Sequence, residues 1–169
     1  MLLEYRIFRT RFGYVGIVGG RRDLRRVFLP AASARLLRAD ILREFPTAGE
    51  NRRLLPRLCA DLQRYFAGQP VRFRVALDWT HAPGFAHAVW QACRKIPYGQ
   101  TASYQQLAER VGRPRAARAV GAAMGRNPWP IVVPCHRVVA SGGGLGGYSG
   151  PGGVDFKRRL LELEARTGA

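Results

Sequence analysis

The sequence contains little lysine, few acidic residues and few cysteines. Two of its 28 basic residues are lysine, Lys95 and Lys157, and the others are arginine. Only 11 acidic residues oppose them, which gives a net charge of +17. Because an arginine bias can follow genomic base composition, the preference for arginine over lysine carries no functional weight here. The sign of the charge favours a polyanionic partner, although charge alone leaves nucleic-acid binding undecided.

The three cysteines, Cys59, Cys93 and Cys135, lie far apart and form no CxxC pair. Their odd number and spacing argue against a disulfide framework and against a cysteine-rich zinc site. The three histidines also lack the spacing of metal ligands. We therefore expect no metal and no cofactor.

Long hydrophobic runs are missing as well. No stretch approaches the roughly 18 apolar residues of a membrane span, and the first residues lack the core of a signal peptide. The hydrophobic content of 47% and the aromatic content of 10% fit a folded protein. We expect a cytoplasmic protein without a membrane partner, associated with the nucleoid if the source is a prokaryote.

The first half of the chain reads as strands followed by helices. Residues 5–31 contain three short β-rich runs separated by glycines, which predict an antiparallel meander. Residues 34–45 have the periodicity of an amphipathic helix. Its apolar face is expected to contain Leu36, Leu37, Ile41, Leu42 and Phe45. Residues 53–66 predict a second such helix, and residues 71–79 alternate as a strand.

These elements predict an N-terminal α/β domain over residues 1–79, followed by a linker at 80–84. The C-terminal domain, residues 85–169, has a different pattern. Ser103 to Gln106 fits a capping box at the start of one helix, and residues 116–124 predict another after a short break. Helix, tight turn and helix is the pattern of a helix-turn-helix motif.

The second of these helices, AARAVGAAM, consists almost entirely of small residues. Arg118 is its only charged side chain. Small residues let a helix backbone approach another surface closely, and that surface is either the protein core or nucleic acid. In the second case, Arg118 would act as a probe. The sequence of the helix alone does not choose between the two.

Cys135 follows the apolar run Ile131–Val133 and Pro134. The run predicts a buried strand, and a buried structural cysteine is the simplest interpretation. The alternative is a nucleophile, which needs a neighbouring base to form the thiolate. His136 is adjacent, but the pair cooperates only if the chain turns at Pro134, because neighbouring side chains on a strand point to opposite faces. Glu164 is a candidate for orienting the imidazole.

The glycine-rich segment at residues 141–153 contains a formal GxGxxG match. No helix opens directly on its last glycine, and no βαβ unit surrounds it. We therefore reject a dinucleotide site and expect a flexible loop over an active site.

Residues 85–164 resemble the O6-alkylguanine-DNA alkyltransferases, also called methylated-DNA–protein-cysteine methyltransferases. The resemblance rests on IPYGQTASYQQLA, AARAVGAAM, NPWPIVVPCHRVV, GYSG and KRRLLELE, in the order of the family. It covers about half of the chain strongly and the N-terminal half only loosely. It implies an α/β N-terminal domain similar to ribonuclease H and a mainly α-helical, winged-helix C-terminal domain.

The resemblance also implies a reaction and the residues that perform it. Cys135 would accept an alkyl group from O6 of guanine, irreversibly and once per molecule, because a thioether has no good leaving group. His136 would act on the thiol through a bound water, Glu164 would orient His136, and Asn127 would brace the turn that carries the cysteine. Tyr104 would donate to the purine ring and offset charge on the leaving guanine.

The DNA contacts implied by the resemblance surround this site. The backbone of Val138 and Ser149 would read the base edge, Tyr148 would form a pocket wall, and Arg118 would fill the stack after the nucleotide flips out. The small-residue helix would enter the minor groove, which is about 6 Å wide. The remaining DNA contacts implied are Ser103, Gln105, Ala116, Ala117, Gly121 and Arg126.

The expected partner is double-stranded DNA that carries O6-alkylguanine, and the expected state is a monomer. Activity on O4-alkylthymine and clustering along DNA are left open, and an inserted-looking stretch at residues 151–153 leaves the range of alkyl groups open. Three alternatives remain. A non-catalytic alkylguanine-binding protein would lack the reactive cysteine, a cysteine hydrolase would leave the small-residue helix unexplained, and a transcription regulator would require a specific operator.

Overall fold

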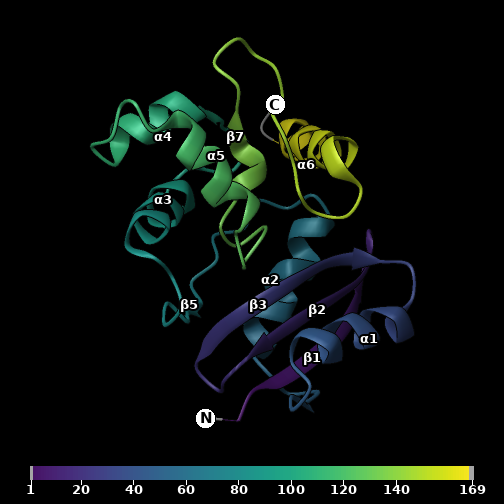
Figure 1. Ribbon diagram of the computed structural model, residues 1–169. Helices are drawn as coiled ribbons and strands as arrows, with labels where there is room; N and C mark the ends of the chain where they lie inside the picture. Colours follow the sequence, from purple (N-terminus) through teal and green to yellow (C-terminus); the bar gives the residue numbers. More distant parts are fainter. Residues whose placement is uncertain (1, 168–169) are drawn as a thin grey trace. The chain divides into compact units, whose positions relative to one another are not determined.

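The computed structural model describes residues 2–167 of the chain. The chain divides between Asp78 and Trp79 into two compact units, and each has its own buried core. Figure 1 shows a sheet packed with helices in the N-terminal unit and mainly helices in the C-terminal unit. Within the described residues, no helix is both long enough and apolar enough to span a bilayer.

The N-terminal unit is built on a five-stranded mixed sheet in the order β4-β1-β2-β3-β5. Its strands are β1 (Glu4–Thr10), β2 (Gly13–Gly19), β3 (Asp23–Ala31), β4 (Gly49–Glu50) and β5 (Ala76–Leu77). The predicted antiparallel meander is confirmed as β1, β2 and β3, and the two short strands add in parallel at the edges. Gly13 adopts φ 120° at the first hairpin, where a Cβ would lie 2.7 Å from the carbonyl oxygen of Ala31.

Two helices, α1 (Ala34–Glu44) and α2 (Pro56–Phe66), lie on opposite faces of this sheet (Figure 1). Leu37 and Ile41 of α1 pack in one buried cluster with Val18 of β2. The prediction for Leu36 was wrong, because its side chain is 58% exposed. Successive helical residues are 100° apart, so Leu37 and Ile41, one turn apart, face the sheet and Leu36 points away from it.

Two further sequence predictions need correction in the N-terminal unit. The second helix begins at Pro56 rather than at residue 53, because proline fits the first turn of a helix, where its missing N–H costs no bond. Of the strand predicted over residues 71–79, only Ala76–Leu77 forms a strand in the structure. Only these two residues pair with β3, and an alternating sequence without a paired backbone does not form a strand.

The C-terminal unit consists of helices around a very small sheet. Its elements are α3 (Gly84–Arg94), β6 (Ala102–Ser103), α4 (Tyr104–Arg110), α5 (Ala117–Gly125), a 3₁₀ turn (Cys135–Arg137), β7 (Val138–Val139) and α6 (Gly153–Thr167). Trp90 of α3 is buried against Trp129, and its Nε1 donates to the carbonyl of Ala123 in α5 at 2.9 Å. Cys93 is fully buried on the same helix, as its position on the apolar face predicts.

The two predicted helices are confirmed as α4 and α5, which pack against each other. The predicted capping box is present, because the Ser103 hydroxyl accepts from the Gln106 amide and the Gln106 side chain accepts from the Ser103 amide. Pairing of β6 with β7 joins Ser103 to Val139. This pairing places the first turn of α4 beside the segment that follows Cys135.

Candidate active site

The segment before Cys135 is a turn, so the prediction of a strand over residues 131–133 was wrong. These residues are buried, as predicted, but Ile131 adopts φ 74° and the Val133 amide donates to the Trp129 carbonyl at 2.8 Å. Pro130 and Pro134 flank the run. Proline has no N–H to donate to a sheet partner, so an apolar run between two prolines is poorly suited to a central strand.

Asn127 closes this turn with its side chain. Its Nδ2 donates to the Val133 carbonyl at 2.8 Å, and its Oδ1 accepts from the Trp129 amide at 3.0 Å. Both bonds are buried, where an unsatisfied backbone group would be costly. The Asn127 amide thereby fixes the chain immediately before Cys135.

After Pro134 the chain enters a 3₁₀ turn, which supplies the change of direction that cooperation between Cys135 and His136 requires. His136 is fully buried, and its Nε2 lies 2.6 Å from Oε1 of Glu164. Arg137 donates to both carboxylate oxygens from Nε and Nη2, and the Gly99 amide donates to Oε2 at 3.0 Å. The carboxylate of Glu164 is thus surrounded by donors.

The charges of this cluster follow from its burial and its hydrogen bonds. Burial by itself would raise the pKa of Glu164, but the bonds from His136 and Arg137 outweigh burial and lower it to about 2. Burial lowers the pKa of His136 more than Glu164 raises it. At neutral pH the carboxylate is therefore ionised and the imidazole neutral. Since the carboxylate can only accept, Nε2 of His136 carries the proton and Nδ1 is the basic nitrogen.

Burial raises the pKa of the Cys135 thiol. The Asn127 amide, the Lys157 ammonium and the Tyr148 hydroxyl lower it, but they do not overcome burial. The thiol is therefore protonated at neutral pH. It becomes a nucleophile only if a base removes its proton during the reaction.

Cys135 lines a pocket of about 650 Å³ in the C-terminal unit. The pocket brings together seven of the residues proposed from the sequence, drawn from α4, α5, the 3₁₀ turn and the glycine-rich loop. They are Tyr104, Ala117, Arg118, Gly121, Cys135, Tyr148 and Ser149. Met124, Gly125 and Gly147 also line it and were not anticipated. The Ser149 hydroxyl donates to the Gly125 carbonyl at 2.9 Å, which ties the loop to the end of α5.

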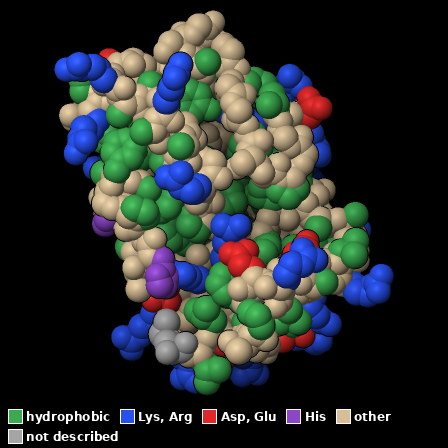
Figure 2. Space-filling view, viewed as in Figure 1, with side chains coloured by type: hydrophobic (Ala, Val, Ile, Leu, Met, Phe, Trp, Pro, Cys, Tyr) green, Lys and Arg blue, Asp and Glu red, His purple; other side chains and the backbone are tan. Residues whose placement is uncertain are grey.

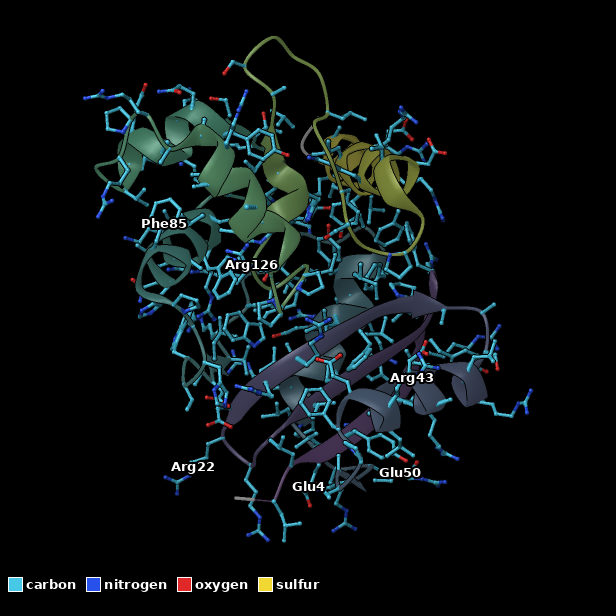
Figure 3. The ribbon with its side chains drawn as sticks, viewed as in Figure 1. Glu4, Arg22, Arg43, Glu50, Phe85 and Arg126 are labelled. Carbon is cyan, nitrogen blue, oxygen red and sulfur yellow. The ribbon has the colours of Figure 1, made fainter. Side chains whose placement is uncertain are left out.

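The other proposed contacts do not line the pocket. The Ser103 hydroxyl is used in the capping box, and Nε2 of Gln105 donates to the Pro114 carbonyl at 2.8 Å. Ala116 is the residue that precedes α5. Arg126 is exposed directly after α5 (Figure 3), and Val138 is fully buried on β7.

Sequence reasoning missed two buried cations. Arg137 belongs to the Pro-Cys-His-Arg motif, yet no role was proposed for it. Lys157 is 0% exposed, and its Nζ donates to the Val138 carbonyl at 2.6 Å, the Gly147 carbonyl at 3.2 Å and the Tyr104 hydroxyl at 3.4 Å. The rarity of lysine singles out two positions, Lys95 and Lys157, and only the structure separates the buried Lys157 from the exposed Lys95.

Comparisons with known proteins agree with this geometry. The model of the family described as 6-O-methylguanine DNA methyltransferase, DNA binding domain, matches residues 84–166, which include the whole pocket. A methylated-DNA–protein-cysteine methyltransferase from Mycolicibacterium paratuberculosis is 49% identical over 117 residues, 69% of each chain. One from Methanosarcina acetivorans is 37% identical over 163 residues, 96% of this chain and 98% of the relative.

The chain belongs to the methylated-DNA–protein-cysteine methyltransferase family. The archaeal match includes both units, so family membership is not confined to the C-terminal half. Among solved structures, that of Mycobacterium tuberculosis OGT in complex with DNA is similar with a TM-score of 0.82 and 36% identity. The similarity covers 97% of this chain and 94% of that one, and it extends the family fold to the mixed sheet of the N-terminal unit.

Proposed function

We propose that this protein repairs DNA by direct reversal, transferring the alkyl group from O6 of guanine to Sγ of Cys135. The observation that carries the proposal is a buried thiol in a pocket, followed in the same 3₁₀ turn by a neutral imidazole that an ionised carboxylate holds in place. That arrangement is suited to a nucleophile that is activated only once the substrate has arrived. Family membership supplies the substrate class, a methylated base in DNA.

In the proposed reaction, the Cys135 thiol gives its proton to Nδ1 of His136 through a bridging water. The sulfur then attacks the alkyl carbon, the bond from that carbon to O6 breaks, and its electron pair stays on the guanine. Glu164 stabilises the imidazolium that forms. Tyr104 donates a hydrogen bond to the leaving purine. The product is a thioether, which has no good leaving group, so each molecule reacts once.

Reaction inside a duplex requires the nucleotide to leave the base stack, because the O6 substituent is otherwise out of reach of a buried thiol. Arg118 is exposed at the pocket, on the same helix as Gly121 and Gly125, which also line it. We assign to Arg118 the position that the flipped nucleotide vacates. Ala119 and Ala122 are exposed on α5, and small exposed side chains suit a helix that enters a groove about 6 Å wide.

The finer description of the fold belongs to the same proposal. The N-terminal sheet with a helix on each face is consistent with a fold similar to ribonuclease H, and α4, α5 and the β6–β7 pair are consistent with a winged helix. The domain limits 1–79, 80–84 and 85–169 remain predictions. So do a cytoplasmic location, a monomeric state and the absence of a cofactor or metal.

Intact-mass analysis tests the function directly. After incubation with excess duplex that contains O6-methylguanine, we expect one added methyl group, located on Cys135, and no further reaction. Cys135→Ser should transfer nothing but bind the duplex with unchanged affinity, because only the nucleophile is altered. Cys59→Ser, a buried cysteine of the N-terminal unit, is the matched control and should still accept one methyl.

Three outcomes would overturn the proposal. Repeated turnover would indicate a hydrolase, a methyl group on another residue would reject the nucleophile, and tight lesion binding by the unmodified protein without transfer would indicate a non-catalytic binder.

A further inference from the structure

Helix α6 has an inner face that supports two different parts of the site. Lys157, Leu160 and Glu164 are buried on this helix at spacings of three and four residues, whereas Asp155, Arg158 and Arg159 are exposed. Residues seven apart lie on one helical face, so Lys157 and Glu164 point the same way two turns apart. Glu164 holds His136, and Lys157 holds Tyr104.

The three donors of the Lys157 ammonium have three acceptors within hydrogen-bond distance. They are the Val138 carbonyl on β7, the Gly147 carbonyl in the glycine-rich loop and the hydroxyl oxygen of Tyr104. An ammonium has no acceptor, so in the bond with Tyr104 the phenol oxygen must accept. The cation also lies 5.6 Å from the centroid of the Tyr104 ring.

Tyr104 is also held from the side of the loop. Gly146 adopts φ 71°, and a Cβ at that position would lie 2.6 Å from the Tyr104 hydroxyl oxygen. Burial raises the pKa of Tyr104 and the neighbouring Cys135 raises it further, while a backbone hydrogen bond from Gly147 acts in the opposite direction. The phenol therefore keeps its proton at neutral pH, and its oxygen accepts both from Gly147 and from Lys157. The hydroxyl proton is left to point away from these two donors.

We propose that Lys157 is a positioning residue for methyl transfer, which fixes the Tyr104 hydroxyl as a donor directed into the pocket. The same ammonium binds the Gly147 carbonyl of the glycine-rich loop and the Val138 carbonyl of β7. It therefore fixes the loop beside the pocket and the Tyr104 hydroxyl at the same time. The inference rests on the proposed function, because it specifies how the donor to the leaving guanine is oriented. Burying an ammonium without a carboxylate partner costs free energy. If the side chain at position 157 only fastened the loop, an apolar side chain would do so without that cost.

Lysine suits this position better than arginine, the residue that the chain otherwise prefers. Its ammonium is compact and directs three donors to three separate acceptors, whereas the planar guanidinium presents five donors in a fixed fork. With Lys157 fully buried, a larger head group would leave donors unsatisfied. The charge also lowers the pKa of the Cys135 thiol, which favours the nucleophilic form.

The test compares Lys157→Met, Tyr104→Phe and the double variant in single-turnover methyl transfer from duplex O6-methylguanine. Lys157→Met should lower the rate constant at saturating DNA by at least about tenfold, with the half-saturating DNA concentration within about twofold of the unmodified protein. The double variant should be no slower than the slower single variant, because both changes remove the same donor. Lys95→Met, at the other and exposed lysine, is the matched control and should react at the unmodified rate.

Two outcomes in the kinetic assay would overturn the inference. Multiplicative losses in the double variant would show that Lys157 and Tyr104 act independently. If Lys157→Met raises the half-saturating DNA concentration but leaves the rate constant unchanged, Lys157 only fastens the loop.

A second measurement does not depend on the folding of any Lys157 variant. In ¹⁵N-lysine-labelled protein, the Lys157 ammonium resonance should shift in Tyr104→Phe and the Lys95 resonance should not. An unmoved Lys157 resonance would overturn the inference. If the unmodified protein transfers no methyl group, the proposed function fails, while this resonance still reports whether Lys157 contacts the phenol.

Discussion

At the scale of single residues, Glu164 shows how burial and hydrogen bonding set the chemistry of a side chain. It is 1% exposed, and its carboxylate accepts from His136, from Arg137 and from the Gly99 amide. An isolated carboxylate so deeply buried would take up a proton. These donors reverse that tendency, so Glu164 stays ionised and fixes which nitrogen of His136 carries the proton.

Glu164→Gln should lower the free energy of unfolding at pH 7. The carboxyl pKa falls from 4.5 to about 2 in the folded protein, which corresponds to about 3 kcal/mol of stabilisation. This stabilisation is complete above pH 4.5 and is lost as the pH falls towards 2, because the unfolded chain takes up the proton first. The difference between the variant and the unmodified protein should therefore narrow below pH 4.5, as measured by urea denaturation at several pH values.

Asp155→Asn is the control for this experiment, because Asp155 lies on the same helix in an exposed ion pair with Arg158. Asp155→Asn should change the free energy of unfolding only slightly at every pH. If the difference in free energy of unfolding between the unmodified protein and Glu164→Gln does not change between pH 7 and pH 3, the assigned protonation state of Glu164 is contradicted.

At the scale of secondary-structure elements, α5 answers the question that its composition raised. Val120, Ala123 and Met124 are buried, so one side of the helix packs in the core. Arg118, Ala119 and Ala122 are exposed. The core interpretation is therefore confirmed for one side of the helix, where its buried residues pack. The other side presents small, exposed side chains, and its contact with nucleic acid stays a prediction.

Arg118→Ala should slow methyl transfer from duplex DNA by about tenfold or more, because nothing would then fill the stack behind the flipped nucleotide. Transfer from the free base O6-methylguanine should remain unchanged, since no stack is opened. Rates on both substrates, measured by intact mass over time, provide the comparison. Arg166→Ala on α6 removes an equal, exposed charge and should affect neither rate appreciably. Equal losses on duplex and free base would reject the role of Arg118.

At the scale of the whole molecule, the positive charge is not concentrated in one unit. Residues 1–80 contain 16 basic and 7 acidic residues, and residues 81–169 contain 12 and 4, so the two parts carry +9 and +8. Figure 2 shows Lys and Arg side chains over the visible surface of both parts, with few acidic ones between them. Charge alone therefore supports DNA binding without locating the binding surface, and the proposed surface rests on the pocket and α5 instead.

Binding to unmodified duplex should fall steeply with salt, because each neutralised phosphate releases condensed counterions. With two or more phosphates contacted, we expect about a tenfold or greater loss of affinity between 50 and 200 mM salt. Methyl transfer from the free base should be nearly independent of salt over that range. Fluorescence anisotropy and intact mass measure the two quantities, and a salt-insensitive duplex affinity would contradict electrostatic binding.

Local patterns made the meander, the two helices α4 and α5 and the capping box at Ser103 predictable, because each depends on residues only a few positions apart. The same local reasoning failed at Ile131–Val133 and at residues 71–79. Both stretches have the composition of strands, but two prolines and the Asn127 side chain impose a turn on the first, and most of the second lacks a partner strand. Strand formation depends on a partner that composition does not reveal.

The sequence by itself determined the family, the candidate nucleophile Cys135 and the residues proposed to surround it, because these are carried by short motifs in a fixed order. The tertiary structure alone decided how they combine. It set Glu164 against His136, 28 residues away, and Lys157 against Tyr104, 53 residues away. The physical reason is that the protonation of His136 depends on burial and on the Glu164 acceptor, and the direction of the Tyr104 hydroxyl depends on the Lys157 donor, both from a distant segment. Glu164 and Lys157 reach their partners only when α6 packs in the C-terminal unit.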